Sequence, residues 1–318
     1  MMQKYFYRLK WFMILCYKVF RRRYLHRGTR LNMKYNGKEV MSARQVNDLL
    51  YQTVSAPPED GFCLARFGGV ELRGFVKFDP NMGSLRDTKD VLRRMSTNAG
   101  FFPATEEAGR RFTEEMRQAC GQVDLLCVWH NPMEDYAMKL YAGDIAYGSP
   151  IGIEPYYFDA PWSRALKGKK VLVINPFADS IRAQYETKRE QLFANPDVLP
   201  EFELHTLKAV QTIAGNRDPR FGDWFEALDY MEREAMKIDF DVAIVGCGAY
   251  GFPLCARLKK HGKIAIHMGG ATQMMFGVKG SRWENNPSFK NIINEHFVRP
   301  AAHEVPENAG KVENACYW

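Results

Sequence analysis

Residues 241–283 read DVAIVGCGAYGFPLCARLKKHGKIAIHMGGATQMMFGVKGSRW, and this stretch decides the fold. Residues 241–245 are apolar enough for a short buried strand, and residues 246–251 follow with GxGxxG spacing. A helix to about His261 and a second strand over 263–267 would complete a βαβ unit. Glycine turns of this kind bring backbone N–H groups and the next helix's N-terminus close to an anion. The stretch therefore predicts a parallel sheet that binds a phosphate-bearing ligand.

A dinucleotide is normally recognised by an Asp or Glu about 20 residues after the first glycine. That position falls at His267-Met268-Gly269-Gly270, which carries no carboxylate, so a nicotinamide or flavin cofactor is disfavoured. The glycines of 246–251 could also serve only the close packing of a helix on a strand. A nucleotide diphosphate fits better, because the second glycine pair is followed by amide, cationic and aromatic side chains: Gln273, Phe276, Lys279, Arg282 and Trp283.

Strand and helix patterns alternate along the rest of the chain. Apolar runs predict strands over 61–66, 123–129 and 170–175, and periodic segments predict helices over 42–54, 106–120, 180–193 and 223–237. Residues 195–200 are expected to form a loop. Short apolar strands separated by helices indicate an α/β fold, Rossmann-like, with a mainly parallel sheet covered by helices on both faces.

The positive charge of the chain is concentrated at its N-terminus. The 318 residues carry a formal net charge of +7, with 44 basic and 37 acidic residues. Residues 1–38 contain eleven Lys or Arg and no acid, which leaves 33 basic and 37 acidic residues in the remainder. Nucleic-acid binding by the folded body is therefore disfavoured. We divide the chain into a basic arm (1–38), one large domain (39–298) and a polar C-terminal tail (299–318) that is draped or loose.

The basic arm predicts an amphipathic helix. Its longest apolar run, residues 11–17, is far shorter than the roughly 20 residues that span a bilayer, and three arginines at 21–23 replace the small residues of a signal cleavage site. Such a helix either lies on an anionic membrane, through residues 1–30, or docks on its own domain or on another subunit. One helical face carries Phe6, Leu9, Met13, Cys16, Tyr17 and Phe20, and the opposite face carries Lys4, Arg8, Lys18 and Arg22.

Cysteine and histidine usage shows no disulfide or zinc pattern. The seven cysteines form no CxxC, and the seven histidines show no ligand spacing. Cysteines of this kind are typical of buried small residues in a reducing compartment. We therefore expect a cytoplasmic protein, or one that is peripheral on the inner face of the cell membrane.

The predicted strands end in segments that should meet at one edge of the sheet, where open α/β sheets bind their ligands. The strand over 61–66 leads into RFGGVE at 66–71, and the strand over 123–129 leads into HNP at 130–132. The strand over 170–175 leads into PFADS at 176–180. With the two glycine turns, these segments form the candidate site.

These motifs resemble those of the GT-D-fold glycosyltransferases, bacterial enzymes of surface-polysaccharide and glycoprotein assembly. The resemblance spans about residues 40–290 and rests on RFGGVE, which matches an RxGxxE pattern, on NPFADSI at 175–181, on the GCGAYG turn and on GGATQMMFGVKGSRW at 269–283. It implies that a sugar is moved from a nucleotide-sugar donor, for which we expect a UDP-linked sugar, to a lipid- or protein-linked glycan acceptor.

The resemblance also implies catalytic roles for Arg66, Glu71 and Asp179. Some members carry Asp-x-Glu in the first motif and hold a divalent metal there, Mn2+ or Mg2+, with Glu71 as the ligand in this chain. Gly69 stands at the Asp position, so a second carboxylate would have to come from elsewhere. The general base that an inverting transfer needs is left open among four residues: Asp144, Glu154, Asp179 and His130.

Donor binding would use backbone amides, cations that neutralise the diphosphate, and aromatic rings that stack on the base or sugar. Lys279 and Arg282 are the expected cations, and Trp283 or Phe276 is the expected ring. The full set of expected donor-binding residues is Gly68, Asn175, Gly246, Gly248, Tyr250, Gly251, Gly269, Gly270, Gln273, Lys279, Arg282 and Trp283.

Two other functions stay open at the level of the sequence. A Rossmann-type oxidoreductase or methyltransferase would also use a glycine turn after a strand. A non-catalytic component of a polysaccharide assembly complex is favoured by one feature, the absence of a carboxylate at Gly69.

Overall fold

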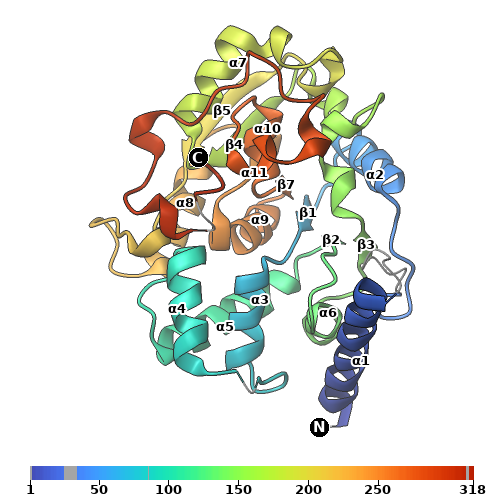
Figure 1. The fold of residues 1–318 in the computed structure, drawn as a ribbon. Helices are drawn as coiled ribbons and strands as arrows, with labels where there is room; N and C mark the ends of the chain where they lie inside the picture. Colours follow the sequence, from blue (N-terminus) through green and yellow to red (C-terminus); the bar gives the residue numbers. More distant parts are fainter. Residues whose placement is uncertain (1, 25–33, 85, 313–314) are drawn as a thin grey trace.

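The computed structural model describes residues 2–24, 34–84, 86–312 and 315–318. A seven-stranded sheet with the order β3-β2-β1-β7-β6-β4-β5 forms its centre, and every pairing between these strands is parallel (Figure 1). The strands are β1 Phe62–Ala65, β2 Leu125–Cys127, β3 Ala146–Gly148, β4 Lys170–Asn175, β5 Glu203–Lys208, β6 Val242–Val245 and β7 Ile264–His267. The predicted α/β fold with a parallel sheet is confirmed.

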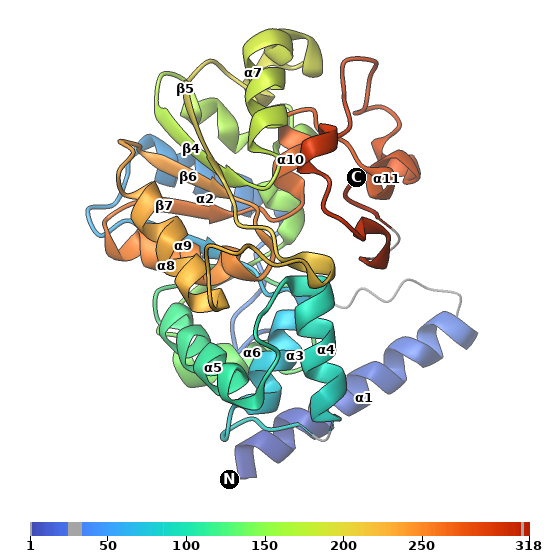
Figure 2. The same ribbon diagram turned by 90° about the vertical axis from the view of Figure 1, so that its left-hand side faces the viewer.

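Helices surround this sheet. They are α1 Met2–Tyr24, α2 Ala43–Ser55, α3 Gly69–Phe78, α4 Thr88–Ala99, α5 Glu106–Cys120, α6 Glu134–Tyr141, α7 Ala178–Leu192, α8 Trp224–Ala235, α9 Gly251–Lys260, α10 Ala271–Met275 and α11 Ser281–Glu284. Figure 2 shows α3, α4, α5, α8 and α9 gathered on one side of the sheet, with α7 on the other. No helix in the described part of the chain combines the length and the apolar character that crossing a bilayer requires.

Alternate residues of each strand enter two separate cores. In β4, Leu172 and Ile174 pack in the core that contains α3, α5, α8 and α9, whereas Val171 and Val173 pack in the core that contains α2, α7 and α10. The strands β6 and β7 are buried along their whole length, and β4 is buried from Val171 onward, because both faces are covered. This explains why they appear in the sequence as continuous apolar runs.

The connections that follow β4 and β6 run in opposite directions. From β4 the chain passes through α7 to β5 at the edge of the sheet, and from β6 it passes through α9 to β7 nearer the centre. Right-handed crossovers therefore place α7 and α9 on opposite faces. A switch of this kind leaves a crevice at the carboxyl ends of the two strands, where ligands of α/β proteins bind.

Most predicted elements are present. The capping box at Ser42 and Gln45 opens α2, and the predicted helix over 106–120 matches α5 in full. The helices α3, α4 and α6 and the strands β3 and β5 were not predicted. The expected loop over 195–200 contains a 3₁₀ turn, Pro196–Val198.

The C-terminal tail is packed rather than loose. Val312, Cys316 and Trp318 are buried, and the side chain of Arg299 donates to the Trp318 carbonyl at 2.8 Å. The tail therefore forms part of the wall around the carboxyl edge of the sheet.

Candidate functional site

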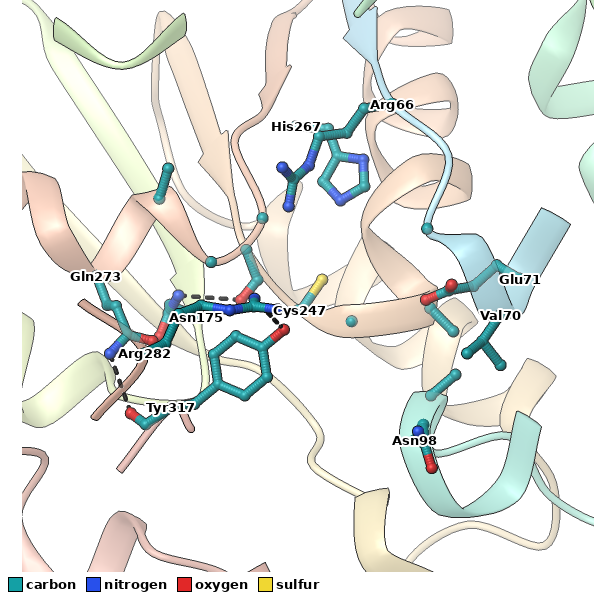
Figure 3. Close-up of a pocket in the computed structure, with 18 of the residues that line it drawn as sticks. Arg66, Val70, Glu71, Asn98, Asn175, Cys247, His267, Gln273, Arg282 and Tyr317 are labelled. Carbon is teal, nitrogen blue, oxygen red and sulfur yellow. Dashed lines mark hydrogen bonds between the residues drawn. The ribbon is translucent and has the colours of Figure 1, made fainter. Parts of the chain in front are cut away.

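A cavity of about 1040 Å³ opens beyond the carboxyl ends of five strands, β1, β2, β4, β6 and β7 (Figure 3). The sequence predicted a site at this edge. Of the residues predicted to bind or catalyse, those that line the cavity are Arg66, Gly68, Glu71, Asn175, Gly246, Gly248, Tyr250, Gly269, Gly270, Gln273, Arg282 and Trp283.

The two glycine turns cross at the base of the cavity, and Asn175 ties them to β4. Its side-chain Nδ2 donates to the Gly246 carbonyl at 3.0 Å, and its Oδ1 accepts from the Phe177 amide at 2.9 Å. A Cβ atom at residue 246 would lie 2.4 Å from the Gly269 carbonyl, so only glycine fits there. Asn175 therefore shapes the turns from a buried position.

Arg66 follows β1 directly and brings a cation into the cavity. Its guanidinium has no hydrogen-bond or ion-pair partner among the described residues, and it lies over the Trp129 ring, 5.5 Å from the ring centre. Burial lowers the pKa of Arg66, and Coulombic attraction to Tyr317, Glu154 and Glu71 opposes this. An arginine stays charged in proteins, so the cavity holds a positive charge that forms no ion pair with any described side chain.

His267, at the end of β7, adds no second charge. Its ring lies beside Arg66 in Figure 3, and burial, followed by repulsion from Arg66, lowers its pKa to about 3. The imidazole is therefore neutral at physiological pH. Its buried Nδ1 atom has no hydrogen-bond partner within the described residues.

Two carboxylates line the cavity, Glu71 and Glu154. Glu71 lies in the first turn of α3, where the helix dipole favours a negative charge. Glu154 lies between two 3₁₀ turns, and the Tyr156 hydroxyl donates to it at 2.5 Å. Burial raises the pKa of Glu154, which the Tyr156 hydrogen bond and the charge of Arg66 counteract. A carboxyl with a raised pKa inside a cavity is suited to accept a proton.

Exposed aromatic rings mark the cavity's wall. Trp129, which is 47% exposed, follows β2, and Tyr157, which is 39% exposed, follows Glu154 in the chain. Few large apolar side chains outside α1 are this exposed in the described structure. Rings in such positions can stack on a base or sugar.

A buried carboxyl group holds the loop that carries Trp129. Glu134 accepts hydrogen bonds from the backbone amides of Trp129 at 3.3 Å and Asn131 at 3.2 Å, and from the Tyr35 hydroxyl at 3.0 Å. Burial raises the pKa of Glu134 to about 7, although these hydrogen bonds oppose the shift. The sequence analysis did not identify Glu134, because its role depends on contacts that no local pattern shows.

Asp179 lies outside the cavity's lining, contrary to the catalytic role predicted for it. It sits in the first turn of α7, where His303 Nε2 contacts its Oδ2 at 3.0 Å and lowers its pKa. Asp179, His303 and Glu304 form a group that could hold a metal ion. Glu304, however, already accepts from the Asp179 amide at 2.9 Å and from the Ser180 hydroxyl, so it caps α7.

Three more predicted residues do not line the cavity. Lys279 forms an ion pair with Glu284 at 3.3 Å. Gly251 packs against the His267 ring. A Cβ atom at residue 251 would lie 2.3 Å from His267 Nε2, so a larger residue would clash with the ring. Phe276 is fully buried in the core beside Tyr185. Lys279 and Phe276 are thus occupied in contacts away from the cavity.

The candidates for the general base are also separated by the structure. Asp144 is exposed and pairs with Lys38, and it does not line the cavity. His130 directs Nδ1 to the Tyr35 hydroxyl at 3.2 Å and is absent from the cavity's lining. Glu154 is the one of the four candidates that lines the cavity.

Other parts of the wall come from segments that sequence reasoning did not connect with the site. The Tyr317 carbonyl accepts a hydrogen bond from Gln273 Nε2 at 3.1 Å, and the Tyr317 hydroxyl accepts one from Arg282 Nη1 at 2.9 Å. Trp318, Thr212 and Asn98 also line the cavity. The aromatic pair at 317–318 was the available signal, since large apolar residues at the end of a polar tail are unusual.

Two solved structures of one domain are similar to this chain. No protein-family model matches the chain, and no curated protein matches it. A selenomethionine-substituted structure of the domain of unknown function 1792 aligns with 83% of this chain and 92% of its own, at 14% identity and a TM-score of 0.45. Another structure of that domain, described as having a distinct glycosyltransferase fold, aligns over the same shares at 15% identity and a TM-score of 0.41.

Proposed function

We propose that the chain is a glycosyltransferase that binds the diphosphate of a nucleotide-sugar donor in this cavity. One observation carries the proposal: the guanidinium of Arg66 stands in the cavity without an anionic partner among the described residues. A partly buried cation without an anion is costly, and a ligand with negative charge removes that cost. Glycine turns beside Arg66 supply backbone N–H groups of the kind that bind phosphate.

The remaining lining fits the other parts of such a donor. Arg282 lies across the cavity from Glu71 in Figure 3 and offers a second cation. Trp129 and Tyr157 offer exposed rings for the base or sugar. The resemblance of the strand-end motifs to GT-D-fold enzymes supports the same class of donor, for which we propose a UDP-linked sugar.

In the proposed transfer, the acceptor hydroxyl attacks the anomeric carbon of the donor sugar. The bond between that carbon and the diphosphate oxygen breaks, and the nucleoside diphosphate leaves with its electron pair. Arg66 and Arg282 stabilise the charge that develops on the leaving group. Glu154 accepts the proton of the acceptor hydroxyl, for which its position and raised pKa suit it.

The proposed divalent cation lacks a full set of protein ligands at this site. Mg2+ and Mn2+ take oxygen ligands, usually from one or two carboxylates together with phosphate. Glu71 is one such ligand, and Gly69 removes the Asp of the related motif. The other lining carboxylate, Glu154, accepts from Tyr156 and faces Arg66. In the proposed transfer the arginines therefore neutralise the leaving diphosphate.

The acceptor that we propose is a lipid- or protein-linked glycan in bacterial surface-polysaccharide or glycoprotein assembly. An enzyme acting on a lipid-linked glycan works at the inner face of the cell membrane, and the basic arm fits that location. The resemblance in the strand-end motifs supports this pathway.

Ligand binding tests the proposal directly. The full chain is screened by thermal shift against UDP-, GDP- and dTDP-sugars, with and without Mn2+, and against NAD, NADP and S-adenosylmethionine. A nucleotide-sugar should raise Tm, since a ligand that binds only the folded state stabilises it. A shift with NAD or S-adenosylmethionine alone would favour the alternative Rossmann-type enzymes, and no shift with any nucleotide-sugar contradicts the proposal.

A matched pair of variants assigns the binding to the cavity. Arg66→Gln should abolish the Tm shift, whereas Arg44→Gln, on the exposed start of α2, should leave it unchanged. Donor binding without hydrolysis or transfer, in the presence of any tested glycan acceptor, would point to a non-catalytic component of an assembly complex.

A further inference from the structure

The N-terminal helix α1 presents most of its described apolar side chains to solvent, whereas its described cations, Lys4, Arg8, Lys10 and Lys18, are half-buried. Between residues 3 and 20, all exposed side chains except Gln3 are apolar or cysteine. Phe6 and Phe12 are 66% and 64% exposed, and the whole stripe comprises Tyr5, Phe6, Leu9, Phe12, Met13, Leu15, Cys16, Tyr17, Val19 and Phe20. This is the reverse of an ordinary surface helix, which directs its apolar face inward.

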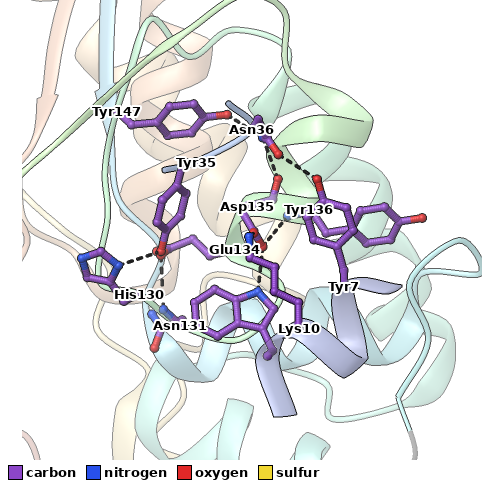
Figure 4. A network of polar contacts seen from close by, with 11 residues as sticks. Tyr7, Lys10, Tyr35, Asn36, His130, Asn131, Glu134, Asp135, Tyr136 and Tyr147 are labelled. Carbon is purple, nitrogen blue, oxygen red and sulfur yellow. Dashed lines mark hydrogen bonds and ion pairs between the residues drawn. The ribbon is translucent and has the colours of Figure 1, made fainter. Parts of the chain in front are cut away.

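The opposite face of α1 is firmly attached to the domain (Figure 4). Trp11, which is 2% exposed, donates from Nε1 to Asp135 Oδ1 at 2.7 Å, and Lys10 pairs with the other oxygen of this buried carboxylate. The Tyr7 ring stacks on Tyr136 with 4.5 Å between ring centres. The helix is therefore held in one rotation about its axis, and the apolar stripe has no room to turn inward.

The cations described between residues 3 and 20 lie on the inner face and flanks of the helix. Arg8 donates to the Met82 carbonyl at 2.8 Å, and Lys18 lies 6.0 Å from the centre of the Trp11 ring. Burial lowers the pKa of Lys18. The predicted helical stripe is thus present, and Arg8 of the predicted basic face contacts the domain. The side chain of Arg22, which was predicted on the same face, is not among those that the structure describes.

The positive charge of the arm distinguishes between two partners that could bind the apolar stripe, a second copy of the chain and an anionic surface. The arm of residues 1–38 has eleven Lys or Arg and no acid. A second copy seated on the stripe would bring two such arms together, and their like charges would repel. An anionic surface is attracted by the same charges. Apolar contact along a helix of 23 residues, about 35 Å at 1.5 Å per residue, requires a flat apolar surface of similar extent.

We infer that α1 is a monotopic anchor whose apolar stripe inserts into the interface of an anionic lipid bilayer, with Trp11 and Lys10 holding it to the enzyme. Aromatic and apolar residues facing the acyl chains, with cations along the flanks, are the known composition of such helices. This inference rests on the proposed function only for the location of the acceptor. The apolar stripe of α1 is the face that contacts the bilayer, and apolar insertion contributes more to the affinity than charge does.

Vesicle binding of the full chain tests the inference. Cosedimentation is measured with vesicles of phosphatidylcholine alone and of phosphatidylcholine mixed with phosphatidylglycerol. We expect binding to both, stronger with phosphatidylglycerol, and high salt should remove only that difference. The double variant Leu9→Glu, Met13→Glu should lower the partition coefficient at least about tenfold. Val305→Glu, at an exposed apolar residue outside α1, should leave it unchanged.

Cys16 offers a second measurement that does not depend on a variant. It is exposed in the stripe, whereas the other six cysteines are buried, so a polarity-sensitive fluorophore can be attached to it selectively. Its emission should shift to shorter wavelength when vesicles are added. A wild-type chain that stays in the supernatant with both vesicles, without a fluorescence shift, overturns the inference.

Sedimentation velocity tests the alternative that a second copy of the chain covers the stripe. A wild-type dimer that the Leu9→Glu, Met13→Glu variant dissociates, with no vesicle binding by either, would assign the stripe to a second copy and overturn the inference. The Tm shift with a nucleotide-sugar should be the same in this variant and the wild type. If the wild-type chain bound vesicles but showed no Tm shift with any nucleotide-sugar, the result would count against the proposed function alone.

Discussion

The guanidinium of Arg66 occupies the space that a side chain at Gly269 would need. A Cβ atom built on Gly269 would lie 1.8 Å from Arg66 Nη2, and Gly269 has a φ of +60°, a conformation that favours glycine. The second glycine turn therefore sets the position of the cavity's cation as well as the path of the chain. Arg66 follows β1 and Gly269 follows β7, so this contact joins the carboxyl ends of two neighbouring strands.

Gly269→Ala should displace Arg66 and weaken donor binding. We expect the Kd for the nucleotide-sugar to rise at least about tenfold, and the free energy of unfolding to fall by about 1–3 kcal/mol from backbone strain. Calorimetric titration and urea unfolding measure the two effects. Gly168→Ala is the matched control, since Gly168 has a φ of +73° with nothing within 4 Å of an added Cβ. If both variants bound donor equally well, the Arg66 contact would have no role in binding.

Asn175→Ala should destabilise the carboxyl edge of the sheet. The substitution leaves the buried Gly246 carbonyl and Phe177 amide without their partners at 3.0 and 2.9 Å, so we expect a loss of about 2–3 kcal/mol in urea unfolding. Asn294→Ala is the control, because Asn294 also donates to two carbonyls, at 3.0 and 3.2 Å, but lies nearer the surface. Its loss should be less than half as large, and equal losses would contradict the role of burial.

Glu154→Gln should abolish transfer while it preserves donor binding. A general base contributes about a hundredfold or more, so kcat should fall by at least that factor with little change in the donor's Kd. Tyr156→Phe removes a hydrogen bond that lowers the pKa of Glu154. The acid limb of the kcat/KM profile should then move to higher pH. An unmoved limb would assign the proton transfer to another group.

Glu134 should make stability depend on pH. Its pKa is raised from 4.5 to about 7, mainly by burial, so the folded state holds the proton more firmly than the unfolded state. The stabilisation that this protonated carboxyl gives the folded state is fully present below about pH 4.5. As the pH rises toward 7, the free energy of unfolding should fall by up to about 3 kcal/mol. In urea unfolding at a series of pH values, Glu134→Gln should lack this decline. Glu190→Gln, on the exposed surface of α7, should retain the wild-type decline.

Lys10→Met should loosen α1, because it leaves the buried Asp135 carboxylate without its cation. We expect a loss of about 2–3 kcal/mol, less than for a fully buried pair since Lys10 is 27% exposed. The double variant Lys10→Met, Asp135→Asn should recover at least half of it, since the amide needs no cation. Urea unfolding and tryptic release of α1 are the measurements. Lys34→Met, in an exposed pair with Glu39, should cost less than about 0.5 kcal/mol.

The parts of the fold that were predictable from sequence are those set by local pattern. Buried parallel strands such as β4 and β6 are continuous apolar runs, and glycine spacing marks the turn after β6. The helix α3 was missed because its first residues, Gly68 and Gly69, are typical of a loop. The edge strand β5, ELHTLK, was missed because its side chains are half exposed and partly charged.

The site was predictable as a place but only partly as a set of residues. Parallel strands must end at one edge, and this brought the RFGGVE segment and both glycine turns to one cavity. Lys279 was wrongly placed in it because an ion pair with Glu284 is not visible in the sequence. Tyr317 was missed because its contact with Gln273 spans 44 residues of the chain. For α1, the pattern predicted a stripe but did not say which face contacts the domain.

The packed tail has a practical consequence for anyone who engineers this protein. Tyr317 and Trp318 hold Gln273, Arg282 and Arg299 through hydrogen bonds, although they stand at the end of a segment that a designer would cut away as unstructured. Shortening the chain after residue 298 would open one side of the cavity to bulk water. Affinity tags and crystallisation truncations are therefore safer when they leave residues 299–318 intact.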